Sequence, residues 1–263
     1  MAKRYDYTGK DVQEVYDGPG GLLWEAVMGE QIHSGGPDAT DRLAQALGLK
    51  PGMHILDVCS ALGAPARQLA QKYGVKVTGL DFTKTMLEKA RQRTKEAGLD
   101  HLITFVEGNA LDMPFKANTF DVVWGQEAWC YVTDKDPLAR ECYRVLKPGG
   151  KIGFTDWVIT GKVEEDLLAK LYESMAFPYM ETFEGWQEVL RRAGFKILDA
   201  QDQTEEFAKC FDEYKVKVEQ ELKPTILQNF GEDLFKFAVN LVNLWRDAAH
   251  RHQVGRGFYI GQK

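Results

Sequence analysis

The stretch HILDVCSALGAPARQLA, residues 54–70, decides how the rest of the chain is understood. Its first five residues are mostly apolar, as in a buried strand, and its second half has the periodicity of a helix. The bend that joins them, residues 59–63, contains a single glycine, Gly63. A buried strand that enters a helix through a tight bend is typical of sites that hold an anionic or nucleotide-like group. Two alternatives follow for this bend: a cofactor loop with substituted glycines, or an ordinary strand-to-helix connection.

The chain around this bend alternates between strand-like runs and helical patterns. Helical patterns at 83–97 and 136–146 separate apolar runs that show little polar alternation. Such strands are buried on both faces, which indicates a mostly parallel sheet with helices on each side. We therefore predict an open, doubly wound α/β fold. Its strands are expected at 54–58, 75–80, 102–106, 120–124, 151–157, 195–200 and 258–260.

Two segments fall outside this alternation. Residues 1–50 contain helical patterns broken by glycine and are expected to form an N-terminal helical cap on the α/β core, residues 51–203. Two long helical stretches within 204–254 precede the last strand, 255–263, and are more than a connection between strands needs. We expect this insertion to form a helical lid over the active-site edge of the sheet.

The composition excludes several functional classes. A net charge of −6 argues against a nucleic-acid partner, which would need a basic face. The chain has no run of about 18 apolar residues that could span a membrane. Its start, MAKRYD, lacks the apolar core of a signal peptide. The four cysteines follow no metal or disulfide spacing, so we expect reduced thiols, no metal and a cytoplasmic location.

Polar residues follow four of the predicted strands, at the edge where an open α/β sheet binds its ligand. Asp57 lies in the first strand, and Asp81 ends the second, 18 positions after Gly63. Nucleotide-binding folds place the carboxylate that grips the ribose hydroxyls at about this separation. The alternative for Asp81 is a charge that a helix N-terminus favours. The other two strand ends carry Asn109-Ala110 and Gln126-Glu127.

The residues of the bend bear on which cofactor it could hold. A nicotinamide dehydrogenase needs three loop glycines so that a diphosphate can approach the helix N-terminus. Residues 59–64 supply one, and Pro65 removes an amide from the first helical turn. S-adenosylmethionine carries no phosphate, so its loop need only pass close to the methionine and the ribose, which Ser60 and Ala61 allow. The bend therefore favours a methyltransferase over a dehydrogenase.

Five segments resemble, in order and spacing, the signatures of class I S-adenosylmethionine-dependent methyltransferases, whose first signature usually reads L-D-x-G-x-G-x-G. They are LDVCSALGAPARQLA at 56–70, VTGLD at 77–81, EGNALDMPF at 107–115, FDVVWGQEAWCYVTDK at 120–135 and ECYRVLKPGGKIGFTDW at 141–157. Within that superfamily, MGEQIHSGG at 28–36 resembles the N-terminal element of the sarcosine/dimethylglycine and tocopherol methyltransferase group. The expected lid and the ending GFYIGQK are similar to that group as well.

The resemblance implies a seven-stranded class I methyltransferase fold, with S-adenosylmethionine as the cofactor. Two of the family's loop glycines are replaced by Cys59 and Ala61. The usual aspartate at the third strand end is replaced by Asn109, whose amide oxygen can still accept from the adenine amino group. The residues expected to bind the cofactor are Asp57, Cys59, Ala61, Gly63, Asp81, Phe82, Asn109, Ala110 and Gln126.

Methyl transfer from a sulfonium depends largely on in-line positioning of the acceptor, and an amine must also lose its proton to a base or to water. By resemblance His33 is the first candidate base; the alternative is a histidine bonded to its own loop backbone. Glu127 is the second candidate catalytic residue, and Asp156 is a further alternative. Aromatic ring faces attract ammonium groups. The residues expected to bind such an acceptor are Trp129, Tyr131 and Trp157.

We therefore expect an S-adenosylmethionine-dependent methyltransferase, with N-methylation of a small amine such as sarcosine or dimethylglycine as the leading interpretation. A carboxylated amine would also need an arginine, which Arg251 or Arg256 could supply from the lid. The alternatives are a C- or O-methyltransferase of a phenol- or quinol-type ring, a dehydrogenase, and a cofactor-binding protein without catalysis. The expected partner is a small-molecule methyl acceptor, and a homodimer is compatible with the sequence.

Overall fold

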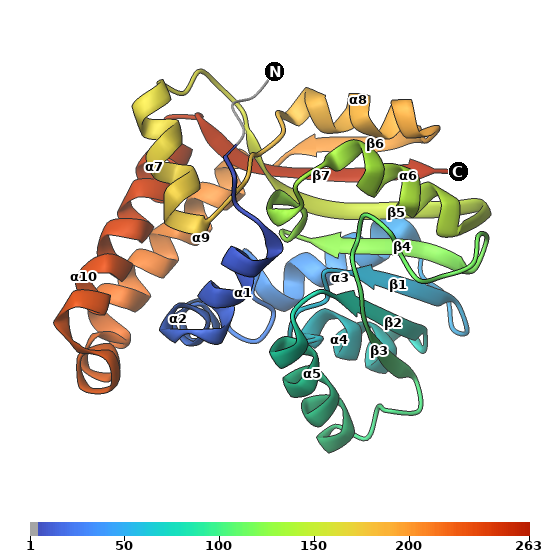
Figure 1. Cartoon of the computed structure of the whole chain (residues 1–263), viewed down its shortest axis with the longest axis horizontal. Coiled ribbons are helices and arrows are strands. Elements are labelled where there is room, and N and C mark those ends of the chain that lie inside the picture. Colours follow the sequence, from blue (N-terminus) through green and yellow to red (C-terminus); the bar gives the residue numbers. More distant parts are fainter. Residues whose placement is uncertain (1–4) are drawn as a thin grey trace.

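In a computed structural model that describes residues 5–263, the chain forms one seven-stranded sheet with helices on both faces (Figure 1). The strands are β1 (His54–Val58), β2 (Lys76–Asp81), β3 (Ile103–Glu107), β4 (Phe120–Gln126), β5 (Leu146–Ile159), β6 (Lys196–Asp202) and β7 (Val254–Gln262). Their order in the sheet is β3-β2-β1-β4-β5-β7-β6. Neighbouring strands are parallel except for the two pairs made by β7. The predicted fold class is confirmed.

Helices cover the two faces of the sheet. On one face, α3 (Gly36–Leu47) and α4 (Ala64–Tyr73) pack on the central strands. On the other lie α6 (Lys135–Val145) and α8 (Phe183–Ala193), while α5 (Lys84–Glu96) packs beside β2 and β3. Ile55 belongs to the first core, and Leu56 to the second, because successive side chains of a strand point to opposite faces.

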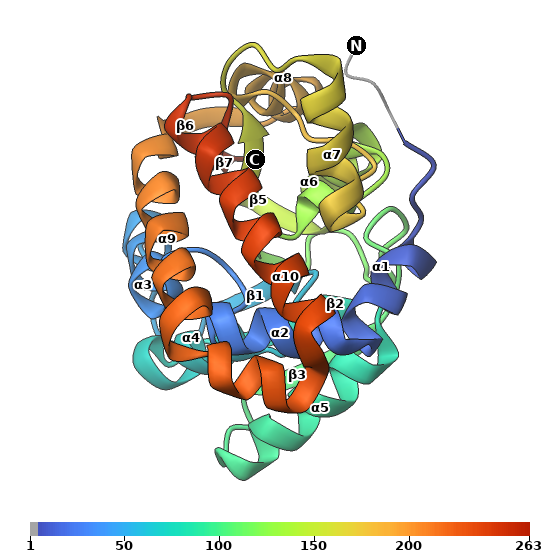
Figure 2. The ribbon, with the colours of Figure 1, turned by 90° about the vertical axis from the view of Figure 1, so that its left-hand side faces the viewer.

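The remaining helices gather at the carboxyl ends of the parallel strands. They are α1 (Gly9–Asp17), α2 (Pro19–Met28), α7 (Glu165–Met175), α9 (Thr204–Val216), a π-helical turn (Lys217–Glu221) and α10 (Lys223–His250). They lie to the left of the sheet in Figure 1 and face the viewer in Figure 2. Their shared apolar core includes Trp24, Phe211 and Trp245. The N-terminal helices and the inserted helices therefore form one layer over the edge where the predicted site residues lie.

The inserted helices α9 and α10 lie between β6 and β7 in the chain, as expected of a lid. Two other helices pack differently from the predicted segments: α3 packs on the sheet, and α7 packs with the inserted helices. The division into residues 1–50, 51–203, 204–254 and 255–263 stays a prediction. Within residues 5–263, no helix combines the length and the apolar character needed to cross a bilayer.

A glycine in β4 lets the chain after that strand fold back on the sheet. A Cβ atom at Gly125 would lie 2.5 Å from the indole of Trp129. Trp129 belongs to a short 3-10 turn, η1 (Trp129–Tyr131), which leads from β4 toward α6. Its indole stacks on Phe154 with 4.3 Å between ring centroids, and its N–H donates to the carbonyl of Val58 at 3.1 Å. The ring of Trp129 is therefore part of the core beneath the turn.

Candidate functional site

A cavity of about 410 Å³ opens at the carboxyl ends of β1 to β4, beside α1. Its volume is within the range of small-molecule sites. Its wall combines the bend after β1, the residues after β2 and β3, and the turn after β4. Seven of the predicted site residues line it: Cys59, Ala61, Asp81, Phe82, Asn109, Ala110 and Tyr131.

The bend between β1 and α4 has the backbone shape of a glycine loop although two glycines are replaced. Cys59, Ala61 and Gly63 have φ angles of 65°, 43° and 67°, all in the left-handed region that favours glycine. Gly63 is required for a second reason, because a Cβ there would lie 2.5 Å from the ring of Phe105. The two side chains at 59 and 61 are therefore accommodated at a cost in backbone strain.

Asp81 is the carboxylate at the centre of the cavity wall. Its Oδ2 accepts from the amide of Ala61 at 2.8 Å, and its Oδ1 accepts from the amide of Thr83 at 2.8 Å. Burial raises the pKa of the Asp81 carboxyl, and these two amide donors oppose that shift. Each carboxylate oxygen has more than one lone pair, so Asp81 can still accept hydrogen bonds from a diol in the cavity.

Phe82 and Asn109 form the side of the cavity next to Asp81. Phe82 leaves 53% of its surface exposed, which is unusual for an aromatic residue and provides a ring face beside the carboxylate. The Asn109 Oδ1 accepts from the amide of Leu111 at 2.9 Å, which leaves a second oxygen lone pair and the side-chain NH₂ group for a ligand. This side can hold a flat heterocycle with polar edges.

Two further predicted cofactor residues lie behind the lining. Asp57 is buried in β1, and its Oδ2 has no hydrogen-bond partner among residues 5–263. Burial and the nearby charge of Asp81 raise the pKa of Asp57 to about 8. Gln126, at the end of β4, accepts through its Oε1 from the hydroxyl of Thr40 at 2.9 Å. These residues support the wall of the cavity from within.

The structure separates the three predicted acceptor-binding aromatics. Tyr131 lines the cavity, whereas Trp129 packs beneath the turn. Trp157 lies in the core formed with the lid helices, with its ring edge-on to Phe207 and Trp245. The sequence predicted that each ring follows a strand end, but β5 runs to Ile159 and includes Trp157. The direction of each ring depends on the space that neighbouring elements leave for it.

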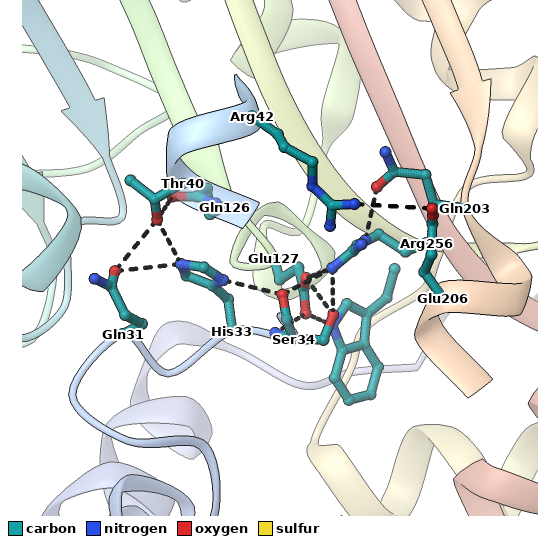
Figure 3. Close-up of polar contacts among 11 residues, drawn as sticks. Gln31, His33, Ser34, Thr40, Arg42, Gln126, Glu127, Gln203, Glu206 and Arg256 are labelled. Carbon is teal, nitrogen blue, oxygen red and sulfur yellow. Dashed lines mark hydrogen bonds and ion pairs between the residues drawn. The ribbon is translucent and has the colours of Figure 1, made fainter. Parts of the chain in front are cut away.

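The two predicted catalytic residues lie in a buried polar cluster next to the cavity (Figure 3). His33 contacts the carbonyl of Ser34 at 3.2 Å and the hydroxyl of Thr40 at 3.0 Å, and burial lowers the pKa of His33. Glu127 accepts from Ser34 and pairs with Arg256 at 3.4 Å. Neither His33 nor Glu127 belongs to the described lining of the cavity.

The N-terminal helix α1 contributes a part of the site that the sequence did not reveal. Thr8, Gly9, Val12 and Tyr16 line the cavity opposite η1. The hydroxyl of Tyr16 lies 3.1 Å from that of Tyr131, and the two rings meet edge-on. The capping box at Thr8 marks the start of this helix, but no local pattern shows that Tyr16 will meet Tyr131, which lies 115 residues further along the chain.

Comparison with known proteins identifies the family. Residues 56–154 match the family model described as a methyltransferase domain. A sarcosine/dimethylglycine N-methyltransferase of Halorhodospira halochloris is 30% identical over 234 residues, which cover 80% of this chain and 81% of the relative. The chain belongs to the S-adenosylmethionine-dependent methyltransferases. The prediction of a small-molecule methyltransferase is therefore confirmed, and S-adenosylmethionine is its cofactor.

Two further proteins are similar to this methyltransferase over most of its length. Phosphoethanolamine N-methyltransferase 3 of Arabidopsis thaliana is 27% identical over 94% of this chain, which spans only 50% of that relative. The solved structure of Haemonchus contortus phosphoethanolamine N-methyltransferase 2, in complex with phosphomonomethylethanolamine and S-adenosylhomocysteine, has a TM-score of 0.90 and 24% identity. The match covers 97% of this chain and 60% of that one. This second likeness shows the shared fold.

The residues of the cavity fit S-adenosylmethionine. Asp81 would accept from the ribose hydroxyls, and Phe82 and Asn109 would hold the adenine. The bend at 59–63 would pass beneath the methionine and ribose, where no phosphate has to be bound and the missing glycine amides matter less.

The strained bend makes a testable prediction at position 61. Ala61→Gly should raise the free energy of unfolding of the cofactor-free protein by about 0.5–1 kcal/mol, because glycine adopts the left-handed backbone without strain. Affinity for S-adenosylhomocysteine should be unchanged or tighter. Chemical denaturation and calorimetry measure the two effects. Ala70→Gly, in the middle of α4, is the matched control and should be destabilising. A less stable Ala61→Gly protein would show that the methyl group is needed for packing.

A second prediction concerns the buried carboxyl of Asp57. Because its pKa is raised to about 8, the folded protein binds this proton more tightly than the unfolded chain does, and stability falls as pH rises from about 4 to about 8. Asp57→Asn removes this titration. The stability of the variant relative to the wild type, without cofactor, should therefore increase by more than about 1 kcal/mol between pH 5 and pH 8.5. A difference that stays constant across these pH values would contradict the assignment.

Proposed function

We propose that this methyltransferase methylates the nitrogen of a small amine, of the class to which sarcosine and dimethylglycine belong. The observation that carries the proposal is the pair of tyrosine hydroxyls, Tyr16 and Tyr131, that meet in the cavity at 3.1 Å. Phenolic oxygens can accept from an amine N–H, and their rings attract a cationic or methylated nitrogen. The names of the similar N-methyltransferases support the same acceptor class.

The charge of the cavity favours a cation. In the described part of the chain, the one charged side chain in the lining is Asp81. The remaining lining is neutral, and residues such as Val12, Ala128 and Val132 are apolar. Charged groups interact more strongly where water is excluded, so the carboxylate attracts the sulfonium of the cofactor and the ammonium of an approaching acceptor.

The two tyrosines act by positioning and not as bases. Burial raises the pKa of both phenols, so they stay neutral at physiological pH. They can form hydrogen bonds with the amine but do not act as the base that removes its proton. S-adenosylmethionine, when bound, supplies an activated methyl group. The contribution of Tyr16 and Tyr131 is to hold the acceptor nitrogen with its lone pair free for that methyl group and to exclude water. The amine proton leaves to water, so the rate rises with pH until the amine is unprotonated.

The cysteines bear on the cellular location of the enzyme, and the net charge bears on the kind of acceptor. All four cysteines, Cys59, Cys130, Cys142 and Cys210, are free in the structure. We propose a cytoplasmic enzyme, since reduced thiols persist in that compartment. The protein has a net charge of −6, which disfavours a polyanionic partner, so we infer that the acceptor is a free small molecule and not a nucleic acid.

The acceptor class is tested with labelled S-adenosylmethionine and a panel of sarcosine, dimethylglycine, ethanolamine, phosphoethanolamine, a catechol and a hydroquinone. We expect turnover of amines. Tyr16→Phe and Tyr131→Phe should lower kcat/KM for the best amine by about 2- to 12-fold each, the loss of one hydrogen bond of about 0.5–1.5 kcal/mol. Tyr143→Phe, whose ring packs on Phe195, is the control and should leave kcat/KM unchanged.

Two results would overturn the proposal. Turnover confined to the catechol or the hydroquinone, with every amine inert, would instead establish the ring-methylating alternative. Wild-type rates in both tyrosine variants would show that the two hydroxyls do not position the acceptor, even if an amine is the substrate.

A further inference from the structure

Glu127 lies outside the cavity yet directly before the residues that form its acceptor side. Ala128, Tyr131, Val132 and Thr133 all line the cavity, and we call residues 128–133 the acceptor wall. We propose that Glu127 is a positioning residue for methyl transfer, which ties the acceptor wall to the N-terminal segment on the opposite side. The proposal rests on methyl transfer in this cavity and not on which acceptor is methylated.

The carboxylate of Glu127 binds three separate parts of the chain (Figure 3). Its Oε2 accepts from the amide of Ser34 at 2.9 Å and from the indole N–H of Trp157 at 2.7 Å. Its Oε1 accepts from the hydroxyl of Ser34 at 2.5 Å and pairs with the Arg256 guanidinium at 3.4 Å. The side chains of Glu127 and Arg256 are 1% and 0% exposed, so these bonds are made in a water-free setting. Each bond there is stronger and harder to replace than at a surface.

Arg256 completes the link between the N-terminal loop and the sheet. Its Nη1 donates to the carbonyl of Ser34 at 2.7 Å, and its Nε donates to Gln203 at 2.9 Å. The arginine on β7 therefore binds this cluster through Nε and Nη1, while its Nη2 has no hydrogen-bond partner among residues 5–263. Ser34 is held by its amide, its hydroxyl and its carbonyl at once.

The backbone at Glu127 explains why its side chain must be anchored. Its φ angle is 52°, in the left-handed region that a non-glycine residue rarely adopts. Such strain persists only where the surroundings over-determine the conformation. The amide of Glu127 donates to the carbonyl of Thr155 at 2.7 Å, and the chain then turns from β4 into η1. The anchored carboxylate therefore fixes the direction in which the acceptor wall leaves the sheet.

The N-terminal side of the cluster reaches the cavity through α1 and α2. Ser34 lies in the loop between α2 and α3, where Gly29 and Gly35 have positive φ angles that glycine adopts without strain. That loop directly follows α2, and α2 directly follows α1, which carries Tyr16. Glu127 thus holds one side of the cavity through its own backbone and the other through Ser34. The 3.1 Å approach of Tyr16 to Tyr131 is the expected consequence.

The experiment compares kcat with cofactor binding in Glu127→Gln, Ser34→Ala and the double variant. Misplacing reacting groups by a fraction of an ångström lowers kcat, so we expect a loss of at least about tenfold for Glu127→Gln and a smaller loss for Ser34→Ala. The Kd for S-adenosylhomocysteine should change by no more than about twofold, because Asp81 and the bend are untouched. The double variant should lose no more than Glu127→Gln alone, since both changes break the same link.

The control is Tyr259→Phe, which removes a hydroxyl bonded to the carbonyl of Phe183 at 3.1 Å, away from the acceptor wall. It should lower the melting temperature and leave kcat unchanged. If Glu127→Gln lowers only the melting temperature, the residue is structural and the proposal fails. If Glu127→Gln does not fold, the test is made with Ser34→Ala alone. An unchanged kcat in Ser34→Ala then overturns the proposal. Loss of the rising limb of the pH–rate profile in Glu127→Gln would also overturn it, by showing a base in contact with the acceptor.

Discussion

The bend from Cys59 to Gly63 is shaped by backbone amides that donate to the end of β2. The amides of Cys59 and Ser60 donate to the carbonyl of Leu80 at 2.7 and 3.0 Å, and that of Ala61 donates to the Asp81 carboxylate at 2.8 Å. The parallel register of β1 and β2, in which Val58 lies opposite Leu80, sets these contacts in place. The bend and the Asp81 carboxylate, which we propose binds the ribose, are therefore one unit. The loop keeps its shape without two of the family's glycines because the neighbouring strand imposes it.

Helix α1, in the layer over this edge, closes one side of the cavity at the strand ends. The first helix supplies Tyr16, and the turn after β4 supplies Tyr131, so the acceptor side depends on two segments that meet only in the folded protein. The buried cluster around Glu127 joins the turn after β4 to the loop that follows α2. In the proposed arrangement, binding of the cofactor and placement of the acceptor rest on different parts of the structure, which fits a reaction that depends largely on positioning.

The sheet, and the strand-end residues that line the cavity, could be predicted from the sequence because each feature is local. Asp81 and Asn109 directly follow buried strands, and strand ends meet at one edge of a parallel sheet. The acceptor side could not be predicted in the same way. Trp129 follows a strand as closely as Tyr131 does, but Gly125 opens a place for its indole in the core. Arg256 was one of two arginines that could reach a carboxylated substrate, and its burial beside Glu127 depends on a loop more than 200 residues earlier in the chain.

Calorimetric titration of S-adenosylhomocysteine into the wild type and Asp81→Asn tests whether the Asp81 cavity binds the cofactor. The asparagine keeps the shape of the side chain and one carbonyl acceptor but loses the charge and an acceptor oxygen. The wild type should bind S-adenosylhomocysteine and give no heat with NAD. Affinity in Asp81→Asn should fall by about 1.5–3 kcal/mol, roughly 10- to 150-fold, as for the loss of charged hydrogen bonds. Equal affinity in the two proteins, or binding of NAD by the wild type, would show that Asp81 does not bind the ribose of S-adenosylmethionine in this cavity.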